Sequence, residues 1–275
     1  MGLLEILKAI ILGMVEGLTE FAPVSSTGHM IIVDDLWLKS SEFLGSKYVA
    51  NTFKVVIQLG SILAVVVVFW QRIVDMLRID RGDKPETRLK LTHVIVGLTP
   101  AAVFGLLFED VIDEYLFTTE TVLIGLVLGA LFMIFADRVS KKKGDKLIPT
   151  VDEITYKQAL TIGMIQCLSL WPGFSRSGAT ISGGVLTGLS HRAAADFTFI
   201  MAVPIMAGAS FLSFIKNLEY FTWDAMPFFV AGFISAFVFA LLAIRFFLKL
   251  INKIKLTPFA VYRIVLAAVI LFIFL

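Results

Sequence analysis

The sequence predicts an all-α polytopic membrane protein with two inverted-topology repeats, each a re-entrant helix-loop-helix hairpin followed by three transmembrane helices. Three observations lead to this fold: an apolar composition, a series of long apolar segments and an internal duplication. Of the 275 residues, 58% are hydrophobic, and the mean hydropathy is +0.89. A soluble domain is closer to about half apolar. The composition therefore favours a chain that lies largely within lipid.

Charge and cysteine content exclude several other classes of protein. The net charge is only +2, so no nucleic-acid partner is expected. The single Cys167 rules out an internal disulfide. With only three histidines in the chain, a Cys/His metal site is not expected either.

Several apolar segments are long enough to cross a bilayer, which takes about 20 residues of helix. The predicted spans are 51–70, 119–137, 195–214, 228–248 and 257–275, and 92–108 is a shorter sixth. The whole chain, 1–275, is therefore expected to form a single integral membrane domain in contact with the lipid bilayer.

The chain contains an internal duplication with an offset of 150 residues. GMVEGLTEFAPVSSTG (13–28) aligns without a gap on GMIQCLSLWPGFSRSG (163–178), and five of the sixteen positions are identical. Three apolar segments follow each copy, which predicts a first repeat over 1–138 and a second over 158–275. Because three spans is an odd number, the second repeat must be inverted relative to the first. Inverted repeats with broken helices at a shared site are a transporter design.

Each copy of the duplicated segment contains a helix break. Pro23 in the first copy and Pro172 in the second stop the helix that precedes them, and the Ser/Thr cluster that follows can cap a new helix. Unwound backbone at membrane depth is tolerated only where protein buries it or water reaches it. We therefore expect two re-entrant hairpins whose tips meet, the first entering from outside and the second from the cytoplasm.

Positive charge predicts the orientation of the chain. Segments 71–92, 138–158 and 245–256 are rich in Lys and Arg, whereas 109–120 has five acidic residues and no basic one. Basic segments remain on the cytoplasmic side of a membrane. The three basic linkers are therefore expected in the cytoplasm.

The first tip collects polar residues that lipid disfavours. Glu16 and Glu20 are four residues apart and share one helical face, a spacing that suits the oxygen ligands of a divalent cation. A pair of interfacial, hydrogen-bonded glutamates is the alternative. Ser25, Ser26 and Thr27 open the next half-helix, whose free N–H groups can bind an anion.

A histidine and an arginine complete the candidate residues. His29 follows Ser26 by one helical turn and is interpreted as an acid or base, against the alternative of a packed core histidine. Arg176 lies between Ser175 and Ser177 at the start of the second half-helix. A buried arginine there suits bidentate phosphate binding, and the alternative is an arginine that reaches the lipid headgroups.

Together these residues predict a phosphoryl-transfer site, in which the protein mainly positions groups and neutralises charge. Three further polar residues within apolar segments carry less weight. Arg263 and Lys54 are interpreted as residues whose charged ends reach the membrane surface, that is, as snorkelling residues. Gln58 is interpreted as a residue that could line a cavity where the two tips meet.

Two motifs of this chain, EGLTEFAPVSSTGHM and WPGFSRSGATISGG, resemble those of the bacterial undecaprenyl-diphosphatase family, the bacitracin-resistance proteins. The resemblance extends through 53–70 and 257–269 and so covers the whole chain. It implies hydrolysis of undecaprenyl diphosphate to undecaprenyl phosphate and inorganic phosphate, which recycles the lipid carrier of cell-wall polymers. It further implies a divalent cation, Mg²⁺ or Ca²⁺, and a site on the periplasmic side of the bacterial cytoplasmic (inner) membrane. Bacitracin would compete for the substrate, and a homodimer is a possible assembly.

The resemblance also implies roles for the residues of both tips. Glu16 and Glu20 would bind the metal or activate the nucleophile, which would be Ser26. His29 would protonate the leaving phosphate or act as a base, and Arg176 would clamp the diphosphate. The residues expected to hold phosphate or to line the second tip are Ser25, Thr27, Ser175, Ser177 and Thr180. A phosphoserine at Ser26 and direct attack by metal-bound water remain open alternatives.

Two other functions are weighed against hydrolysis. A polyprenyl-phosphate transporter or flippase would use the same inverted-repeat site, because that architecture permits alternating access. A purely structural membrane scaffold leaves the paired polar tips unexplained and is discounted.

Overall fold

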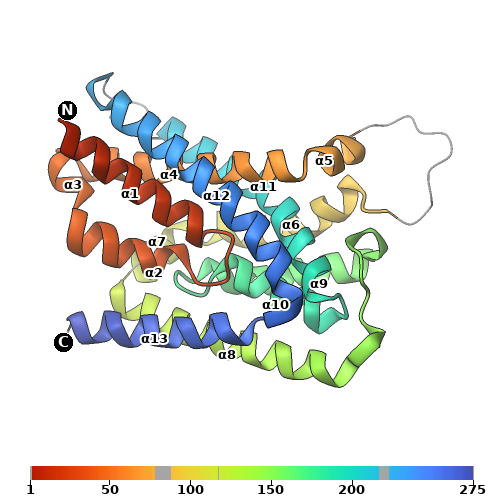
Figure 1. Cartoon of the computed structure of the whole chain (residues 1–275). Helices are drawn as coiled ribbons and strands as arrows, with labels where there is room; N and C mark the ends of the chain where they lie inside the picture. The colour runs from red at the N-terminus through yellow and green to blue at the C-terminus, as the bar shows by residue number, and fades with distance from the viewer. Residues whose placement is uncertain (1, 78–87, 117, 217–222, 275) are drawn as a thin grey trace.

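The structure, a computed structural model, describes residues 2–77, 88–116, 118–216 and 223–274. Within these ranges the regular elements are helices, and the one extended pairing is a bridge between Ile148 and Leu189. Figure 1 shows the long helices running side by side, with both chain termini at the same end of the molecule. The predicted all-α fold is confirmed.

Among the described residues, five helices are long and apolar enough to cross a membrane. They are α4 (Lys47–Val68), α8 (Thr119–Lys143), α11 (His191–Lys216), α12 (Met226–Ile254) and α13 (Thr257–Phe274). A sixth apolar helix, α6 (Leu91–Leu107), is shorter. Each predicted span overlaps one of these helices.

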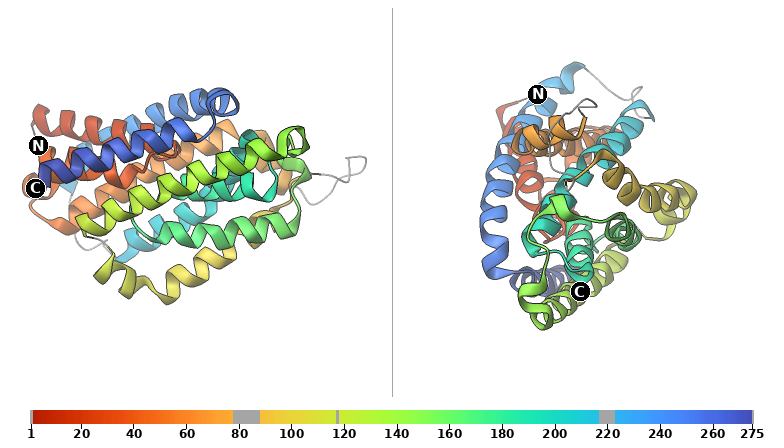
Figure 2. Two further views of the ribbon diagram at one scale, coloured as in Figure 1. Left: turned by 90° about the horizontal axis from the view of Figure 1, so that it is seen from below. Right: turned by 90° about the vertical axis from the view of Figure 1, so that its right-hand side faces the viewer.

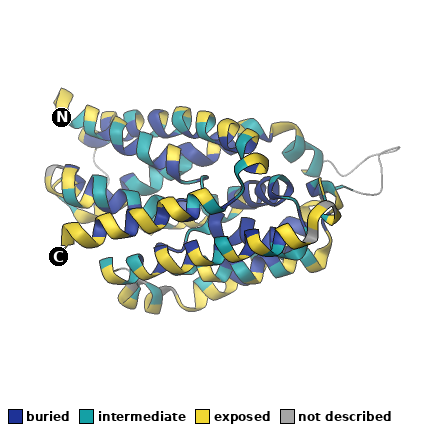
Figure 3. Ribbon diagram, turned by 60° about the horizontal axis from the view of Figure 1, so that its bottom comes forward, coloured by how far each residue is buried: buried dark blue, intermediate teal, exposed yellow. Residues whose placement is uncertain are grey.

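The outward faces of the helices are apolar. Phe135, Phe246 and Phe272 are exposed on α8, α12 and α13, and Figure 3 shows exposed residues along the outside of the bundle with buried residues where helices meet. An apolar outer surface on helices that satisfy their own backbone hydrogen bonds is what a bilayer requires. The chain is therefore a multi-pass membrane protein.

Two broken helices give the hairpins that the sequence predicts. The first consists of α1 (Leu3–Thr19), α2 (Ser26–Met30) and the π-helical segment η1 (Ile31–Leu38). The second consists of α9 (Tyr156–Gln166), the 3₁₀ segment η4 (Cys167–Leu170) and α10 (Arg176–Thr187). The helices are interrupted around Pro23 and Pro172, so both predicted breaks are confirmed.

Equivalent helices of the two halves make equivalent contacts. α1 of the first repeat packs on α12 of the second, and its counterpart α9 of the second repeat packs on α6 of the first. The pairs α4 with α11 and α8 with α13 join the halves. In Figures 1 and 2, α4 and α8 run in one direction and their counterparts α11 and α13 in the opposite direction. These directions support the inverted relation between the repeats, which remains a prediction of the sequence.

The basic and acidic linkers lie at different ends of the bundle in Figure 1. Toward the right are the described parts of the basic linkers: α5 (Trp70–Leu77), η2 (Gly144–Lys146), η3 (Val151–Glu153) and the end of α12. Toward the left are α7 (Glu109–Tyr115) and η6 (Trp223–Ala225). Much of the first basic linker, residues 78–87, lies outside the described residues.

Two matched glycines allow the hairpins to approach the spans closely. A Cβ atom on Gly163 would meet the carbonyl oxygen of Gly97 on α6, and one on Gly13 would meet the carbonyl oxygen of Gly232 on α12. Small residues that let backbones come together are typical of helix contacts in membranes. These two glycines therefore fix how deeply α9 and α1 pack into the bundle.

The Gly163→Ala variant is expected to lower the thermal unfolding temperature of the protein in detergent. The added methyl group has no room between α9 and α6, and overpacking of this kind costs about 1–3 kcal/mol. Gly208→Ala is the matched control on α11, because a Cβ atom there meets nothing within 4 Å. A Gly163→Ala protein that unfolds at the wild-type temperature, as followed by circular dichroism, would contradict this packing.

Candidate active site

The structure brings the tips of the two hairpins together. Arg176, the first residue of α10, contacts Glu20, which follows α1, with 3.0 Å between Nη2 and Oε1. The hydroxyl of Ser177 donates to the carbonyl oxygen of Ala22 at 3.1 Å. Both contacts join residues about 155 positions apart in the chain. The duplicated segments therefore form one polar junction inside the bundle.

Glu20 links this junction to the first half-helix. The hydroxyl of Ser26 donates to Glu20 Oε2 at 2.6 Å, while Oε1 accepts from Arg176. The Glu20 and Arg176 side chains are only 10% and 15% exposed, respectively. Because little water competes there, these charge-assisted contacts are strong. One carboxylate thus holds both a serine hydroxyl and a guanidinium in place.

Arg176 retains a donor that no described group accepts. Its Nη1 atom is buried and has no hydrogen-bond partner, while the guanidinium carbon lies 5.7 Å from the centroid of the Phe21 ring. Phe21 in turn packs edge-on against Phe199, with the ring centroids 5.2 Å apart. A guanidinium fixed by an aromatic ring, with one N–H side still unpaired, is suited to bind a phosphate oxygen.

The two half-helices begin in the same way. Ser25 and Ser175 have positive φ angles of 69° and 73°, and their hydroxyls accept the backbone N–H of Gly28 and Gly178, respectively. Non-glycine residues adopt this conformation rarely. An identical, strained start in both repeats indicates that each chain reversal is set by its serine cap.

Of the other predicted site residues, some lie at the junction and one lies in the interior beneath it. Thr27 is half-buried in the first turn of α2, and Ser177 shares a 3.2 Å contact with the Ser175 hydroxyl. Thr180 is fully buried. Its hydroxyl donates to the carbonyl oxygen of Arg176 and accepts from Thr198. The structure therefore places Thr180 as support beneath the tip, with its hydroxyl committed to protein groups.

His29 lies beside the junction and not against the Ser26 hydroxyl. Its Nδ1 atom is 2.7 Å from the carbonyl oxygen of Ser25, and its Nε2 atom is 2.6 Å from the hydroxyl of Tyr262 on α13. A carbonyl oxygen only accepts, so Nδ1 carries the proton and a neutral His29 accepts the Tyr262 O–H. Tyr262 is a site residue that sequence reasoning missed, because it lies outside both motifs.

Glu16 completes the acidic side of the junction. It is buried, it lies one helical turn before Glu20, and its Oε1 atom has no hydrogen-bond partner. Oxygen donors from Glu16, Glu20 and Ser26 fit a hard cation such as Mg²⁺ or Ca²⁺. No group of three or more Asp, Glu, His or Cys side chains is arranged for a metal in the described part of the chain. A cation here would therefore need ligands from the substrate as well.

Arg263 corrects one sequence interpretation. This residue was expected to snorkel to the membrane surface, but its side chain is fully buried. Its Nη2 atom donates to the carbonyl oxygens of Gly173 and Phe174, both at 2.9 Å, and to that of Gly125 at 3.3 Å. Helix breaks leave backbone carbonyls unpaired. Arg263 satisfies those of the second break and so holds the loop that presents Arg176.

The Arg263→Met variant is expected to unfold at a lower temperature than the wild type and to release less phosphate in the assay described below. Methionine keeps much of the side-chain volume but leaves buried carbonyl groups unpaired, at about 1–3 kcal/mol each. The exposed Arg138 on α8 provides the control, Arg138→Met. Equal thermal transitions for the two variants would show that the second tip does not depend on this guanidinium.

Comparisons with known proteins identify the family of the chain. The family model for bacitracin resistance protein BacA matches residues 9–269. The chain is 76% identical over 273 residues to the undecaprenyl-diphosphatase of Geobacillus sp. (strain WCH70), with 98% of each chain covered. It is 61% identical over 277 residues to the undecaprenyl-diphosphatase of Bacillus subtilis (strain 168), with 99% of each covered. The chain therefore belongs to the bacitracin resistance protein BacA family.

Proposed function

We propose that this protein hydrolyses undecaprenyl diphosphate to undecaprenyl phosphate and inorganic phosphate. The observation that carries the proposal is the continuous contact from Ser26 through Glu20 to Arg176 across the two tips. The names of the relatives point to the same reaction. Hydrolysis would return the lipid carrier to cell-wall synthesis, and removal of the diphosphate that bacitracin binds would confer resistance.

Glu20 and Ser26 are arranged for attack on the terminal phosphorus. Glu20 Oε2 would take the proton of the Ser26 hydroxyl, and Oγ would form a bond to phosphorus as the bond to the bridging oxygen breaks. Undecaprenyl phosphate would leave, and water would then release phosphate from Ser26. A general base within hydrogen-bond reach of the nucleophile is the arrangement this chemistry needs. Attack by water activated at Glu20 is the alternative that omits the phosphoserine.

Arg176 would stabilise the charge that develops on the phosphoryl oxygens. Its Nη1 atom is buried and unpaired, its Nη2 atom contacts the same carboxylate as the Ser26 hydroxyl, and a preorganised donor in a water-poor site is worth more than one in water. A divalent cation, Mg²⁺ or Ca²⁺, held by Glu16 and Glu20 would supply further neutralisation of phosphate charge. Glu16 is the better ligand of the two, because one of its oxygens is uncommitted.

In its protonated form, His29 would supply from Nε2 the proton that the leaving undecaprenyl phosphate takes up, once the Tyr262 hydroxyl no longer donates to that nitrogen. The Tyr262 hydroxyl donates to Nε2 of His29, and Nδ1 is held by the Ser25 carbonyl oxygen. A histidine oriented by a fixed partner is the usual donor in such steps. Ser25, Thr27, Ser175 and Ser177 would surround the phosphates at the two half-helix starts.

The orientation in the membrane is part of the proposal. We place the basic linkers 71–92, 138–158 and 245–256 in the cytoplasm of a bacterial cell and the site on the periplasmic side, following the positive-inside rule. Bacitracin would then compete for substrate on the outer face. A homodimer is compatible with this arrangement and would be tested by the mass of the protein in detergent.

A polyprenyl-phosphate transporter is the second candidate, and the opposite directions of equivalent helices favour it. Purified protein in detergent with undecaprenyl diphosphate and Mg²⁺ separates the two functions. We expect phosphate release that a chelator abolishes and that added Mg²⁺ or Ca²⁺ restores, because Arg176 alone cannot neutralise a diphosphate beside the two acidic side chains Glu16 and Glu20. Binding of the lipid without phosphate release would favour the transporter.

A further inference from the structure

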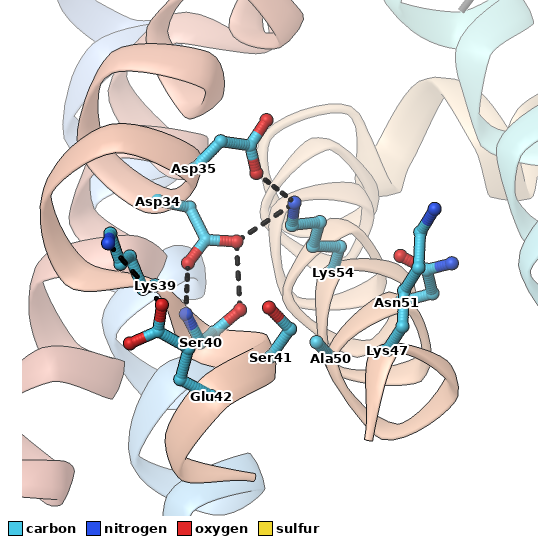
Figure 4. Close-up of a pocket in the computed structure, with 10 residues that line it drawn as sticks. All are labelled: Asp34, Asp35, Lys39, Ser40, Ser41, Glu42, Lys47, Ala50, Asn51 and Lys54. Atoms are coloured by element: carbon cyan, nitrogen blue, oxygen red, sulfur yellow. Dashed lines mark hydrogen bonds and ion pairs between the residues drawn. The ribbon is translucent and has the colours of Figure 1, made fainter. Parts of the chain in front are cut away.

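A polar cavity lies apart from the junction, at the end of the bundle near the chain termini. It has a volume of about 360 Å³ and opens between η1, the short helix α3 (Ser40–Phe43) and the start of α4. Figure 4 shows the side chains around it. Its lining consists of Asp34, Asp35, Lys39, Ser40, Ser41, Glu42, Lys47, Ala50, Asn51 and Lys54. None of the catalytic candidates lines this outer cavity.

Lys54 is the centre of the cavity wall. Its ammonium group lies 2.8 Å from Asp34 Oδ2 and 3.1 Å from Asp35 Oδ1, and Figure 4 shows both carboxylates converging on it from η1. Asp34 is buried and also accepts from the backbone N–H and the hydroxyl of Ser40. The sequence interpretation of Lys54 as a snorkelling residue is therefore wrong, since the ammonium group is tied to two acids.

The two carboxylates on Lys54 differ in how firmly they hold it. Asp34 is 3% exposed and fully hydrogen-bonded, whereas Asp35 is 53% exposed. Exposed ion pairs contribute little to stability, so an incoming anion can displace Asp35 while Asp34 keeps Lys54 in position. Lys47, the first residue of α4, has no ion-pair partner in the described part of the chain. The cavity lining therefore contains one unpaired ammonium group, that of Lys47, and a second, that of Lys54, which becomes available to an anion when Asp35 moves away.

A polar stripe runs along α4 from the outer cavity into the bundle. Lys47, Asn51, Lys54, Gln58 and Ser61 follow one another at intervals of four and three residues, so they lie on one face of the helix. The Ser61 hydroxyl is fully buried and has no partner. Polar groups inside a membrane helix usually mark a substrate or ion path.

We propose that the outer cavity is a second binding site for a phosphate group, formed by Lys47, Asn51 and Lys54, and that it receives the inorganic phosphate that leaves the junction. The origin of the phosphate at the junction rests on the proposed hydrolase function. The ammonium groups and the Asn51 amide donate to the phosphate oxygens. The Asp35 carboxylate then moves away from Lys54. The polar face of α4 gives the released anion a path that avoids lipid.

The test is direct binding of radiolabelled inorganic phosphate to the full-length protein in phosphate-free detergent. An Arg176→Gln background removes the guanidinium at the junction and leaves the outer cavity intact. We expect this variant to bind phosphate still, and the further change Lys47→Gln to weaken binding about tenfold through loss of a charge-assisted contact. Lys47 is exposed and unpaired, so this change should not disturb folding. Lys157→Gln, exposed at the other end of the molecule, is the matched control.

Lys54 gives a second arm of the test. Lys54→Gln should abolish the phosphate binding of the Arg176→Gln protein, and Lys54→Arg should restore it. Phosphatidylglycerol added to the micelles distinguishes the source of the phosphate group: unchanged binding identifies free phosphate, and displacement identifies a lipid headgroup.

Two results would overturn the proposal: no phosphate binding to Arg176→Gln, or binding that is indifferent to both Lys47 and Lys54. Because the assay needs no turnover, failure of hydrolysis in the wild type would leave the cavity site standing, and failure of the cavity site would leave hydrolysis standing.

Discussion

Replacing Arg176 by glutamine is expected to slow phosphate release from undecaprenyl diphosphate by about 10²–10³-fold, the usual loss when one oxyanion donor is removed. Arg176 holds Glu20 at 3.0 Å and presents an unpaired, buried Nη1 atom. Glutamine can neither neutralise the phosphoryl oxygens nor orient Glu20. The loss should appear in single-turnover rates with purified protein, substrate and Mg²⁺ in detergent.

The exposed Arg245 on α12 supplies the matched control for this prediction. Arg245→Gln removes the same charge at a distance from both tips and should release phosphate at the wild-type rate. Thermal unfolding of both variants verifies that they are folded. A folded Arg176→Gln protein with wild-type turnover would remove the guanidinium from the mechanism.

Replacing Ser26 by alanine is expected to lower the rate on the order of 10³-fold or more, as loss of a nucleophile does in hydrolases that form covalent intermediates. The Ser26 hydroxyl lies 2.6 Å from Glu20 Oε2, which is the length of a short hydrogen bond in which the carboxylate accepts the proton. Alanine leaves Glu20 and Arg176 in place, so substrate binding should change much less than the rate. Rapid quench of protein mixed with substrate labelled at the terminal phosphate measures both.

The same quench distinguishes the two routes to hydrolysis. Label retained on the wild-type protein and absent from Ser26→Ala supports a phosphoserine. A Ser26→Ala protein that turns over at nearly the normal rate would eliminate the covalent route and leave attack by water as the mechanism.

Much of the fold follows from local sequence signals. Apolar segments longer than a bilayer is thick mark the spans, and prolines next to Ser/Thr clusters mark the breaks at Pro23 and Pro172. The ungapped match between 13–28 and 163–178 led to the expectation that Arg176 would meet the acids of the first tip, which the structure bears out at Glu20. The spans and the breaks can be predicted because each depends on residues close together in the chain, and the junction can be predicted because two such local motifs repeat.

The remaining parts of the site depend on partners that the chain brings in from elsewhere. Arg263 and Tyr262 are adjacent in α13, yet one satisfies the carbonyls of the second tip and the other bonds to His29 in the first. Lys54 forms an ion pair with Asp34, and no sequence motif marks this pairing. A single ionisable residue in an apolar run fits snorkelling as well as burial, so only the packing of the helices could distinguish the two.

A double-mutant cycle between Glu20 and Arg176 tests most directly whether the two repeats build one active site. The variants Glu20→Gln, Arg176→Lys and their combination would be compared in single-turnover phosphate release, with thermal unfolding as the check on folding. Residues that act as a unit are strongly non-additive. If the two tips form one site, the double variant should be little slower than the slower single variant. Losses that multiply would show that the two residues act independently and would contradict a shared site.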